Sequence, residues 1–544
     1  MGKMLSFGVR NLRSFGAAER LIPVKPINVF VGKNSCGKST FLRTYPLLRQ
    51  SVESDTRSPI LWYGGYGGYV DFGDFGTALR DGQQEITFDF QMELNMVRYG
   101  DLFMNTSMKR IYAIDHHIDL FGDGELIGTH VIMVRLSVNR GEDQSLESRL
   151  ESSSEGIESS LVFSGGAVKS FTFRSCETDF CESFDVELVS EKGSLIPISV
   201  ARIKELKTRD SVTVRRIDED FIRVEASQRV LALLAGAKIK AINKKIKTKI
   251  DSLAFGSLSA TADSLRKAFP THAESFDTST KEGLDLVEGI RVNLFARNVF
   301  GFWASADDLL KEFYGGVRYL GPLRASAERF YRFQDLQVAE IDHTGSNLPM
   351  VINSLDSRSK RELSKWMQDN FGFSLELQLV GSHYALRIKE VGEERFHNIS
   401  DMGFGYSQIL PVIVSVWLEL VDPRDRFALG ISSRRLRKQK TRTLVIEQPE
   451  LHLHPALQYK FGRAISKVAA LGKDQGYNFV IETHSKSFIE ALGESIRVGE
   501  LSSDDVSIGL FEKNAHGVTE VNFSGYDEEG YLVNWPAGFL SPEL

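Results

Sequence analysis

Eight consecutive residues near the N-terminus have the types and the spacing of a phosphate-binding loop. They match the pattern GxxxxGK[ST] and are Gly32, Lys33, Asn34, Ser35, Cys36, Gly37, Lys38 and Ser39. The two glycines let the backbone wrap closely, so that its N–H groups point at phosphate oxygens. Lys38 adds a positive charge for the terminal phosphates, and the Ser39 hydroxyl can ligate Mg²⁺. The loop follows an apolar, strand-like run and leads at Thr40 into a predicted helix, so it is predicted to bind ATP with Mg²⁺.

Two later segments place polar residues directly after apolar runs. Thr443 to Ile446 ends at Glu447, where a phosphate loop needs a magnesium-binding carboxylate on a neighbouring strand. Phe479 to Ile481 is followed by Glu482, Thr483, His484 and Ser485. His484 is predicted to donate a hydrogen bond to the γ-phosphate, and a purely structural histidine is the alternative.

A fourth candidate element has closely spaced glycines. Asp401-Met402-Gly403-Phe404-Gly405-Tyr406-Ser407-Gln408 leads into a predicted helix, Ile409 to Leu420. A glycine-rich helix start is an anion site. The pattern is weak by itself, but it becomes specific together with the phosphate loop, the acidic strand end and the strand-end histidine.

The bulk composition is that of an ordinary globular protein with more than one domain. The chain has 544 residues, of which 42% are hydrophobic and 25% charged, and a net charge of −6. That charge excludes a uniformly basic nucleic-acid coat protein. Three cysteines cannot form a disulfide framework, and no apolar run approaches the roughly 20 residues of a membrane helix. We therefore expect a cytoplasmic protein without a membrane contact.

The apolar pattern changes along the chain. Strand-like runs at Ile86 to Leu94 and Val131 to Val138 are followed by a Ser-, Glu- and Gly-rich stretch, 140–160, which predicts an exposed loop. From about Gln228 to Phe269 the spacing is helical. After Val317 an alternation of strands and helices begins and continues almost to the C-terminus.

Two basic segments are candidate contacts for DNA or RNA. Residues 238–249 hold six lysines beside a stripe of isoleucines, and residues 434–442 hold six arginines and lysines. Clustered cations bind nucleic acid by releasing its counterions. A solvated helix face and a solvated loop are the alternative interpretations.

The four elements, taken in their order, resemble the ABC-type ATPase superfamily, in particular its soluble SMC/RecF-like and overcoming-lysogenization-defect branches. Three segments look closer still to bacterial ATPases of anti-phage defence islands, above all the Septu-type ATPase that works with an HNH nuclease, sometimes within a retron. These segments are Tyr319-Leu320-Gly321-Pro322-Leu323-Arg324, the run IEQPELHLHP at 446–455 and Trp535-Pro536-Ala537-Gly538-Phe539. The resemblance covers about residues 1–95 and 317–544.

The resemblance implies an α/β fold, an ABC-type P-loop ATPase head split in sequence by a large α+β insertion. The N-terminal half is then 1–95 and the insertion 96–316. The C-terminal half is 317–544, and it holds the glycine-rich signature (401–408), the magnesium carboxylate Glu447 and the switch histidine His484. In such proteins the signature of one head closes on the ATP of another, which would bring Gly403, Gly405 and Gln408 to a partner's nucleotide. The resemblance places His452 and His454 at the contact between heads, and a metal pair is the disfavoured alternative.

Two residues depart from the family's pattern. Relatives often have a serine in the signature where this chain has Gly403. A glutamate that activates water usually follows the magnesium carboxylate, and here that residue is Gln448, which can orient water but cannot take its proton. We therefore expect slow hydrolysis of ATP, with Glu447, Gln448 and His484 at the catalytic centre and Glu450 as an alternative base.

The sequence after His484 holds no nuclease motif, and only about 60 residues remain there, too few for a nuclease domain of typical size. Any cutting of nucleic acid is thus expected from another chain. The resulting hypothesis is an ATPase that dimerises head to head on ATP and acts as a sensor or scaffold for a nuclease, of the HNH type, in anti-phage defence. The alternative is an SMC/RecF-like DNA-repair ATPase acting on DNA ends, although sustained heptads are missing from the insertion. The size of the insertion disfavours a transporter subunit.

Overall fold

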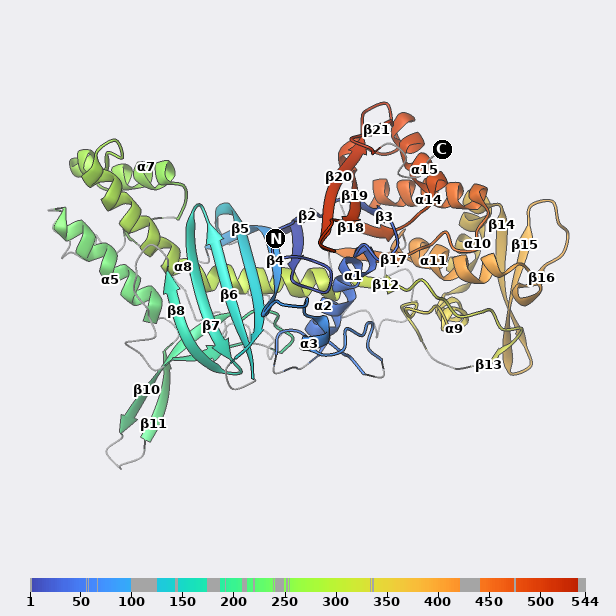
Figure 1. Ribbon diagram of the computed structural model, residues 1–544, viewed down its shortest axis with the longest axis horizontal. Helices are drawn as coiled ribbons and strands as arrows, with labels where there is room; N and C mark the ends of the chain where they lie inside the picture. Colours follow the sequence, from blue (N-terminus) through green and yellow to red (C-terminus); the bar gives the residue numbers. More distant parts are fainter. Residues whose placement is uncertain are drawn as a thin grey trace. The chain divides into compact units, whose positions relative to one another are not determined.

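The computed structural model forms two compact units (Figure 1). The first comprises Met1–Val9, Ser54–Pro59 and Gln84–Lys311, and the second Arg10–Glu53, Ile60–Gln83 and Glu312–Leu544. The structure describes the chain except residues 1, 55, 57, 66, 99–124, 142–144, 174–185, 191, 208–212, 219–220, 238, 240–248, 251–252, 254, 333, 335–336, 421–440, 474–475 and 537–544. Within the described residues, no helix combines the length and the hydropathy that a membrane span requires.

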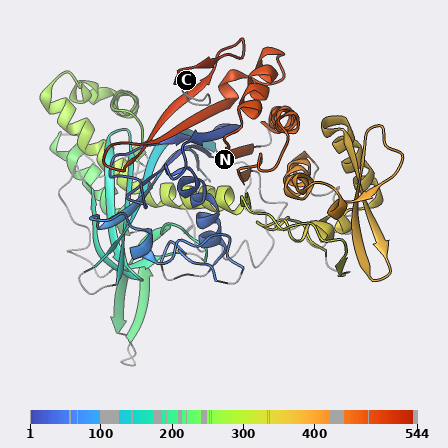
Figure 2. The ribbon, with the colours of Figure 1, turned by 45° about the vertical axis from the view of Figure 1, so that its right-hand side comes forward.

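The first unit is built on one large sheet whose strands follow the order β11-β10-β9-β8-β7-β6-β5-β4-β1. From β4 to β11 all neighbours are antiparallel, and β10 and β11 extend as a ribbon (Figures 1 and 2). The strands are β1 (Lys3–Arg10), β4 (Glu85–Arg98), β5 (Glu125–Arg140), β6 (Leu146–Ser154), β7 (Ile157–Ser164), β8 (Ala167–Phe173), β9 (Val186–Val189), β10 (Ser199–Lys207) and β11 (Thr213–Asp218). The helices are α5 (Phe221–Gly236), α7 (Leu258–Ala268), the 3₁₀ helix η1 (Pro270–Phe276) and α8 (Lys281–Gly315), whose last turn belongs to the second unit.

The prediction of an exposed loop at 140–160 is wrong, because β6 and β7 occupy most of it. Alternate residues of both strands are buried, and many of these are serines. The hydroxyls of Ser152 and Ser159 lie 2.6 Å apart, and the indole N–H of Trp303 donates to Ser152 Oγ over 2.9 Å. Since these buried hydroxyls are paired, the low hydrophobicity of the segment did not require exposure.

Among the described residues, helices α5 and α7 bear out the helical prediction for parts of 228–269. Most of the basic segment 238–249, and the basic segment 434–442 up to residue 440, lie outside the described residues. The proposed nucleic-acid contacts there stay predictions.

The second unit contains a mainly parallel sheet in the order β12-β17-β18-β3-β19-β20-β21. The strands from β12 to β19 are parallel, and β20 and β21 are antiparallel additions at the edge. The strands are β12 (Val317–Leu320), β17 (Arg442–Glu447), β18 (Tyr477–Glu482), β3 (Ile27–Gly32), β19 (Val506–Lys513), β20 (Thr519–Tyr526) and β21 (Leu532–Val533). The segment β2 (Ile22–Pro23) precedes β3.

Helices cover the central strands of this sheet on both faces, which explains why β3 is a continuous apolar run buried along its whole length. Alternate residues Ile27, Val29 and Val31 belong to a core shared with α11, α14 and α15, whereas Phe30 packs edge-on against Phe41. The helices are α1 (Lys38–Leu42), α2 (Thr44–Glu53), α3 (Phe75–Ala78), α11 (Phe404–Leu420), α14 (Pro455–Gly472), α15 (Lys486–Arg497) and the 3₁₀ helix η4 (Ser503–Asp505).

A smaller antiparallel sheet, seen beside α10 in Figure 2, lies between β12 and α11 in the sequence. Its central strand is β15 (His383–Glu390), which pairs with β14 (Phe373–Val380), β13 (Tyr331–Arg332) and β16 (His397–Asn398). The helices here are α9 (Leu348–Ser354), α10 (Ser357–Phe371) and the 3₁₀ helix η2 (Ile399–Asp401).

The compact units differ from the expected boundaries at 95 and 316. Residues 84–95 belong to the first unit because β4 pairs with β5 along its length. Residues 1–9 also belong there, with β1 beside β4. The mixed α/β fold is confirmed, with a mainly parallel sheet assembled from two distant parts of the chain and a large α+β insertion between them.

Candidate functional site

The phosphate loop joins β3 to α1, and its two glycines are sterically required. Gly32 has φ +153° and Gly37 φ +102°, and a Cβ at these positions would lie 2.2 Å from the Phe511 carbonyl oxygen and 2.5 Å from Thr519 Oγ1. Ser35 also has a positive φ, +62°. The loop is thus tightly wrapped and held by the neighbouring strands β19 and β20, as phosphate binding by backbone N–H groups requires.

Lys38 is buried at the start of α1, with 3% of its surface exposed. Its Nζ donates hydrogen bonds of 2.9 Å to the carbonyl oxygens of Gly32 and Lys33. Cys36 Sγ lies 3.9 Å from the same nitrogen, and burial raises the pKa of the Cys36 thiol. The ammonium group is therefore held against the backbone of the loop itself.

Glu447 ends β17 and is 2% exposed. Arg43, which follows α1, binds both carboxylate oxygens, with Nε 2.7 Å from Oε1 and Nη2 3.0 Å from Oε2. The Tyr319 hydroxyl donates to Oε1 over 2.7 Å. The hydrogen bond with Glu447 raises the pKa of Arg43, so the guanidinium keeps its positive charge. The structure places Glu447 at the loop's edge of the sheet, as predicted for the magnesium carboxylate.

A second carboxylate, Glu482, lies beside Glu447 at the end of β18. The two residues are paired in the parallel register, and Glu482 is also paired with Phe30 of β3. Its Oε2 accepts a hydrogen bond of 2.7 Å from Ser39 Oγ, and its Oε1 lies 3.7 Å from Lys38 Nζ. Burial raises the pKa of Glu482, the Ser39 hydroxyl lowers it, and the charge of Glu447 raises it again.

The residues after these two strands are held by backbone and side-chain contacts. Gln448 has φ +44°, and its N–H donates to the Glu482 carbonyl over 2.9 Å. Glu450 accepts from Thr483 Oγ1 (2.9 Å) and from the His484 N–H (2.6 Å), and burial raises its pKa. Partial desolvation and the charge of Lys38 lower the pKa of His484, which favours its neutral form. The predicted residues Gln448, Glu450 and His484 thus lie at the same edge of the sheet.

The signature residues differ from one another in their surroundings. Gly403 is exposed, and a Cβ there would meet nothing within 4 Å. A Cβ on Gly405 would lie 2.6 Å from the His452 carbonyl oxygen of the same chain. Gln408 is 2% exposed, and its amide bonds to the backbone of Arg324. Gly403 is thus open to a partner, while Gly405 and Gln408 have contacts within the chain.

Two histidines expected at the contact between heads lie in the turn before α14. The His454 Nδ1 accepts from the Ala456 N–H over 3.2 Å and so caps the helix. The ring of His452 packs edge-on against Phe404, with centroids 4.9 Å apart, and Phe404 is 49% exposed. This turn therefore lies against the start of the signature helix.

Sequence reasoning missed Glu482, Arg43 and Tyr319 as parts of the site. Arg324 is 5% exposed and donates from Nη2 to the Glu447 carbonyl over 2.8 Å. Burial lowers the pKa of Arg324 to about 10. One signal was available: β17 and β18 both end in Val-Ile-Glu.

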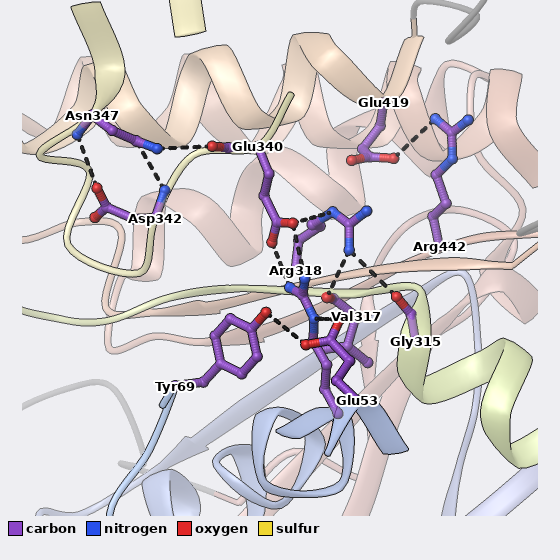
Figure 3. A network of polar contacts seen from close by, with 11 residues as sticks. Glu53, Tyr69, Gly315, Val317, Arg318, Glu340, Asp342, Asn347, Glu419 and Arg442 are labelled. Carbon is purple, nitrogen blue, oxygen red and sulfur yellow. Dashed lines mark hydrogen bonds and ion pairs between the residues drawn. The ribbon is translucent and has the colours of Figure 1, made fainter. Parts of the chain in front are cut away.

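A separate polar network lies at the start of β17 (Figure 3). Arg49 binds both carboxylate oxygens of Glu340, and Arg318 Nε lies 3.3 Å from the same carboxylate. Arg442 Nη1 lies 3.4 Å from Glu419 Oε2. Apart from Arg49, these charged groups line a small pocket together with apolar residues of β12, β17 and α11. Burial alone would raise the pKa of Glu340, but Arg318 and Arg49 lower it, so the network is an internal set of ion pairs.

The residues at the loop fit Mg·ATP by their chemistry. Carboxylate and hydroxyl oxygens at Ser39, Glu447 and Glu482 are the hard ligands that Mg²⁺ prefers. Mg²⁺ normally uses one or two carboxylates, with phosphate and water as its other ligands. Ser39 and Glu447 would hold the ion, which would supply positive charge against the charge that develops on the phosphates, and Lys38 and the loop N–H groups would hold the phosphates.

A strand, a glycine loop and a helix, next to two acidic strand ends of a parallel sheet, define an ABC-type P-loop ATPase fold. Consistently, the sequence profile of a family described as AAA ATPase domain matches residues 323–489. This segment holds the signature, Glu447, Glu482 and His484, and it begins after the phosphate loop. The chain therefore carries an ATPase domain whose loop comes from a distant part of the sequence.

Several solved structures are similar to this chain at low identity. The Smc head domain of Pyrococcus furiosus, with an extended coiled coil and bound to the C-terminal domain of ScpA, has 10% identity over 96% of each chain and a TM-score of 0.32. The SMC head domain from Thermotoga maritima has 10% identity over 96% of this chain and 98% of that chain, with a TM-score of 0.33. Comparison with curated proteins gives no match.

Proposed function

We propose that this chain binds Mg·ATP at the phosphate loop, hydrolyses it slowly, and uses it to close head to head with a second copy. The observation that carries the proposal is the assembly of Lys38, Ser39, Glu447 and Glu482 at one edge of a parallel sheet. These residues come from distant parts of the chain, and their functional groups are the ones that Mg²⁺ and phosphate require.

Head-to-head closure is supported by the surroundings of the signature. Gly403 precedes α11 and is open, and the exposed ring of Phe404 continues that surface. A loop and a signature on the same chain complete two equivalent sites when two copies meet across a two-fold axis. Each ATP would then be held by the phosphate loop of one copy and by the start of α11, next to Gly403, of the other copy.

We further propose that the closed dimer acts as a sensor or scaffold that controls a nuclease supplied by another chain, in anti-phage defence. The support is the sequence resemblance to Septu-type ATPases. Gln448 in place of a glutamate favours ATP as a ligand that holds the heads together over rapid turnover.

Light scattering of the full-length protein with and without Mg·ATP tests the closure. We expect ATP to double the mass of the wild type, and Gly403→Glu to stay monomeric because its carboxylate would face the γ-phosphate of the partner. Gly166→Glu is the matched control, since Gly166 is an exposed turn residue of the first unit with nothing within 4 Å of its Cβ position. A closed dimer of Gly403→Glu would show that Gly403 does not face nucleotide.

The defence role is tested by phage plating on cells that carry the gene with its neighbouring genes. We expect the wild type to protect and Lys38→Ala to lose protection at equal protein level. Protection that survives Lys38→Ala would contradict control by ATP, and loss of protection on deleting a neighbouring nuclease gene is the expected sign of the effector.

A further inference from the structure

A carboxylate outside the phosphate-loop pattern contacts both reactive side chains of the loop. Glu482, 2% exposed, accepts the Ser39 hydroxyl over 2.7 Å and lies 3.7 Å from the Lys38 ammonium. We propose that Glu482 is a positioning residue for Mg²⁺, which fixes the Ser39 hydroxyl in the orientation that ligates the ion. This inference rests on the proposed binding of Mg·ATP.

The direction of the hydrogen bond between Ser39 and Glu482 supports this role. A serine hydroxyl has one proton and two lone pairs. Because the Ser39 hydroxyl donates a hydrogen bond to Glu482 Oε2, the lone pairs of its oxygen remain available to a cation. A carboxylate that accepts a hydrogen bond from a metal ligand orients that ligand and increases the basicity of the ligand atom. Glu482 therefore acts on Mg²⁺ through Ser39.

The position of Glu482 in the sheet also supports a positioning role. β18 lies between the loop strand β3 and the Glu447 strand β17. The parallel register pairs Glu482 with Glu447, and alternation along the strands places both side chains on the face of the sheet that α1 contacts. A carboxylate at this position of β18 is adjacent to Ser39, Lys38 and Glu447.

The charges around Glu482 support the same role. Two neighbouring buried carboxylates repel each other, and such a pair is costly without cations. Lys38 and Arg43 supply two positive charges, one for each carboxylate. Replacing Glu482 by a neutral residue leaves an excess positive charge at the loop, which favours ATP without Mg²⁺ and removes part of the attraction for Mg²⁺.

The affinity for ATP, measured in Mg²⁺ and in EDTA, distinguishes a positioning role of Glu482 from a structural one. Calorimetric titration of ATP into full-length protein gives the dissociation constant in Mg²⁺ and in EDTA. For Glu482→Gln we expect affinity in Mg²⁺ to fall about 10–100-fold, while affinity in EDTA is unchanged or higher. A carboxylate that only braced the loop would, on removal, weaken both affinities alike, and this result would overturn the inference.

Three further variants complete the experiment. Glu419→Gln changes a buried, ion-paired carboxylate at the other end of β17 and should keep the full effect of Mg²⁺. Ser39→Ala should lose the same Mg²⁺ effect as Glu482→Gln, and the double variant should lose no more, because both act through one hydroxyl. Additive losses would overturn that mechanism.

Glu482→Asp gives an independent test if Glu482→Gln does not fold, as judged by circular dichroism. It keeps the charge but draws the acceptor back by one methylene, so the Mg²⁺ effect should fall in part. An unchanged Mg²⁺ effect would contradict the inference. A wild type that binds no ATP in either buffer would instead overturn the proposed function.

Discussion

Strand β17 has an arginine–glutamate pair at each end, and the glutamate of each pair is buried. At its start Arg442 contacts Glu419 of α11, with 3.4 Å between Nη1 and Oε2. At its end Glu447 is bound by Arg43 through two hydrogen bonds of 2.7 and 3.0 Å. The two glutamates are 7% and 2% exposed, so burial and pairing do not distinguish them.

The neighbours of the two pairs do distinguish them. The pair at the start borders a pocket lined by further ion pairs and apolar side chains. The pair at the end adjoins the glycine loop, Lys38, Ser39 and a second carboxylate. Because ligands of open parallel sheets bind at the carboxyl ends of strands, we propose that the same ion-pair chemistry is structural at the start of β17 and functional at its end.

The largest expected effect concerns the residue next to the functional pair. Gln448→Glu should raise the steady-state rate of phosphate release by about 10²–10⁴, the usual contribution of a general base. Gln448 already has a positive φ, which glutamate tolerates equally poorly, so the change is mainly chemical. A wild type that is already fast, and collapses in Glu450→Gln, would make Glu450 the base and contradict the proposal.

Lys38→Ala should lower the hydrolysis rate by about 10²–10³, the cost of removing one preorganised donor. ATP binding should weaken by roughly 10–100-fold, since a charge-assisted contact contributes about 1.5–3 kcal/mol. Calorimetric titration checks this, with circular dichroism as the control for folding. Unchanged affinity in a folded variant would contradict the assignment of the phosphate loop.

Glu447→Gln should reduce the gain in ATP affinity from Mg²⁺ by about tenfold or more, because a ligand or an outer-shell partner of the ion is lost. Arg43 would keep only a neutral acceptor, so affinity in EDTA should rise. Titration in Mg²⁺ and in EDTA measures both changes. Equal affinities of variant and wild type in Mg²⁺ would place the metal carboxylate elsewhere.

The sequence predicted the functional end of β17 better than the contacts around it. The loop, β3 and Glu447 follow from local patterns: a glycine spacing, an apolar run and an acidic strand end. Arg43 and Tyr319 were missed because they lie 404 and 128 residues from Glu447 in sequence. Glu482 was missed although β18 ends like β17, since only the register shows that the two ends are neighbours.

Two other differences have the same origin in non-local pairing. The serine-rich strands β6 and β7 bury hydroxyls that satisfy one another and Trp303, which composition does not show. The amide of Gln408, which the resemblance assigned to a partner's nucleotide, bonds to the Arg324 backbone. Local patterns predicted the elements, and the partners of buried polar groups required the fold.

The smallest functional effect is expected at the structural end of β17. Glu419→Gln removes a charge facing Arg442 but keeps an acceptor, so the free energy of unfolding should fall by about 1–3 kcal/mol. Urea denaturation measures this loss. ATP affinity in Mg²⁺ and in EDTA should both equal those of the wild type, because Glu419 lies at the opposite end of the strand from the loop. A change in the effect of Mg²⁺ in this variant would show that the two ends of β17 are energetically coupled, and the distinction drawn between them would fail.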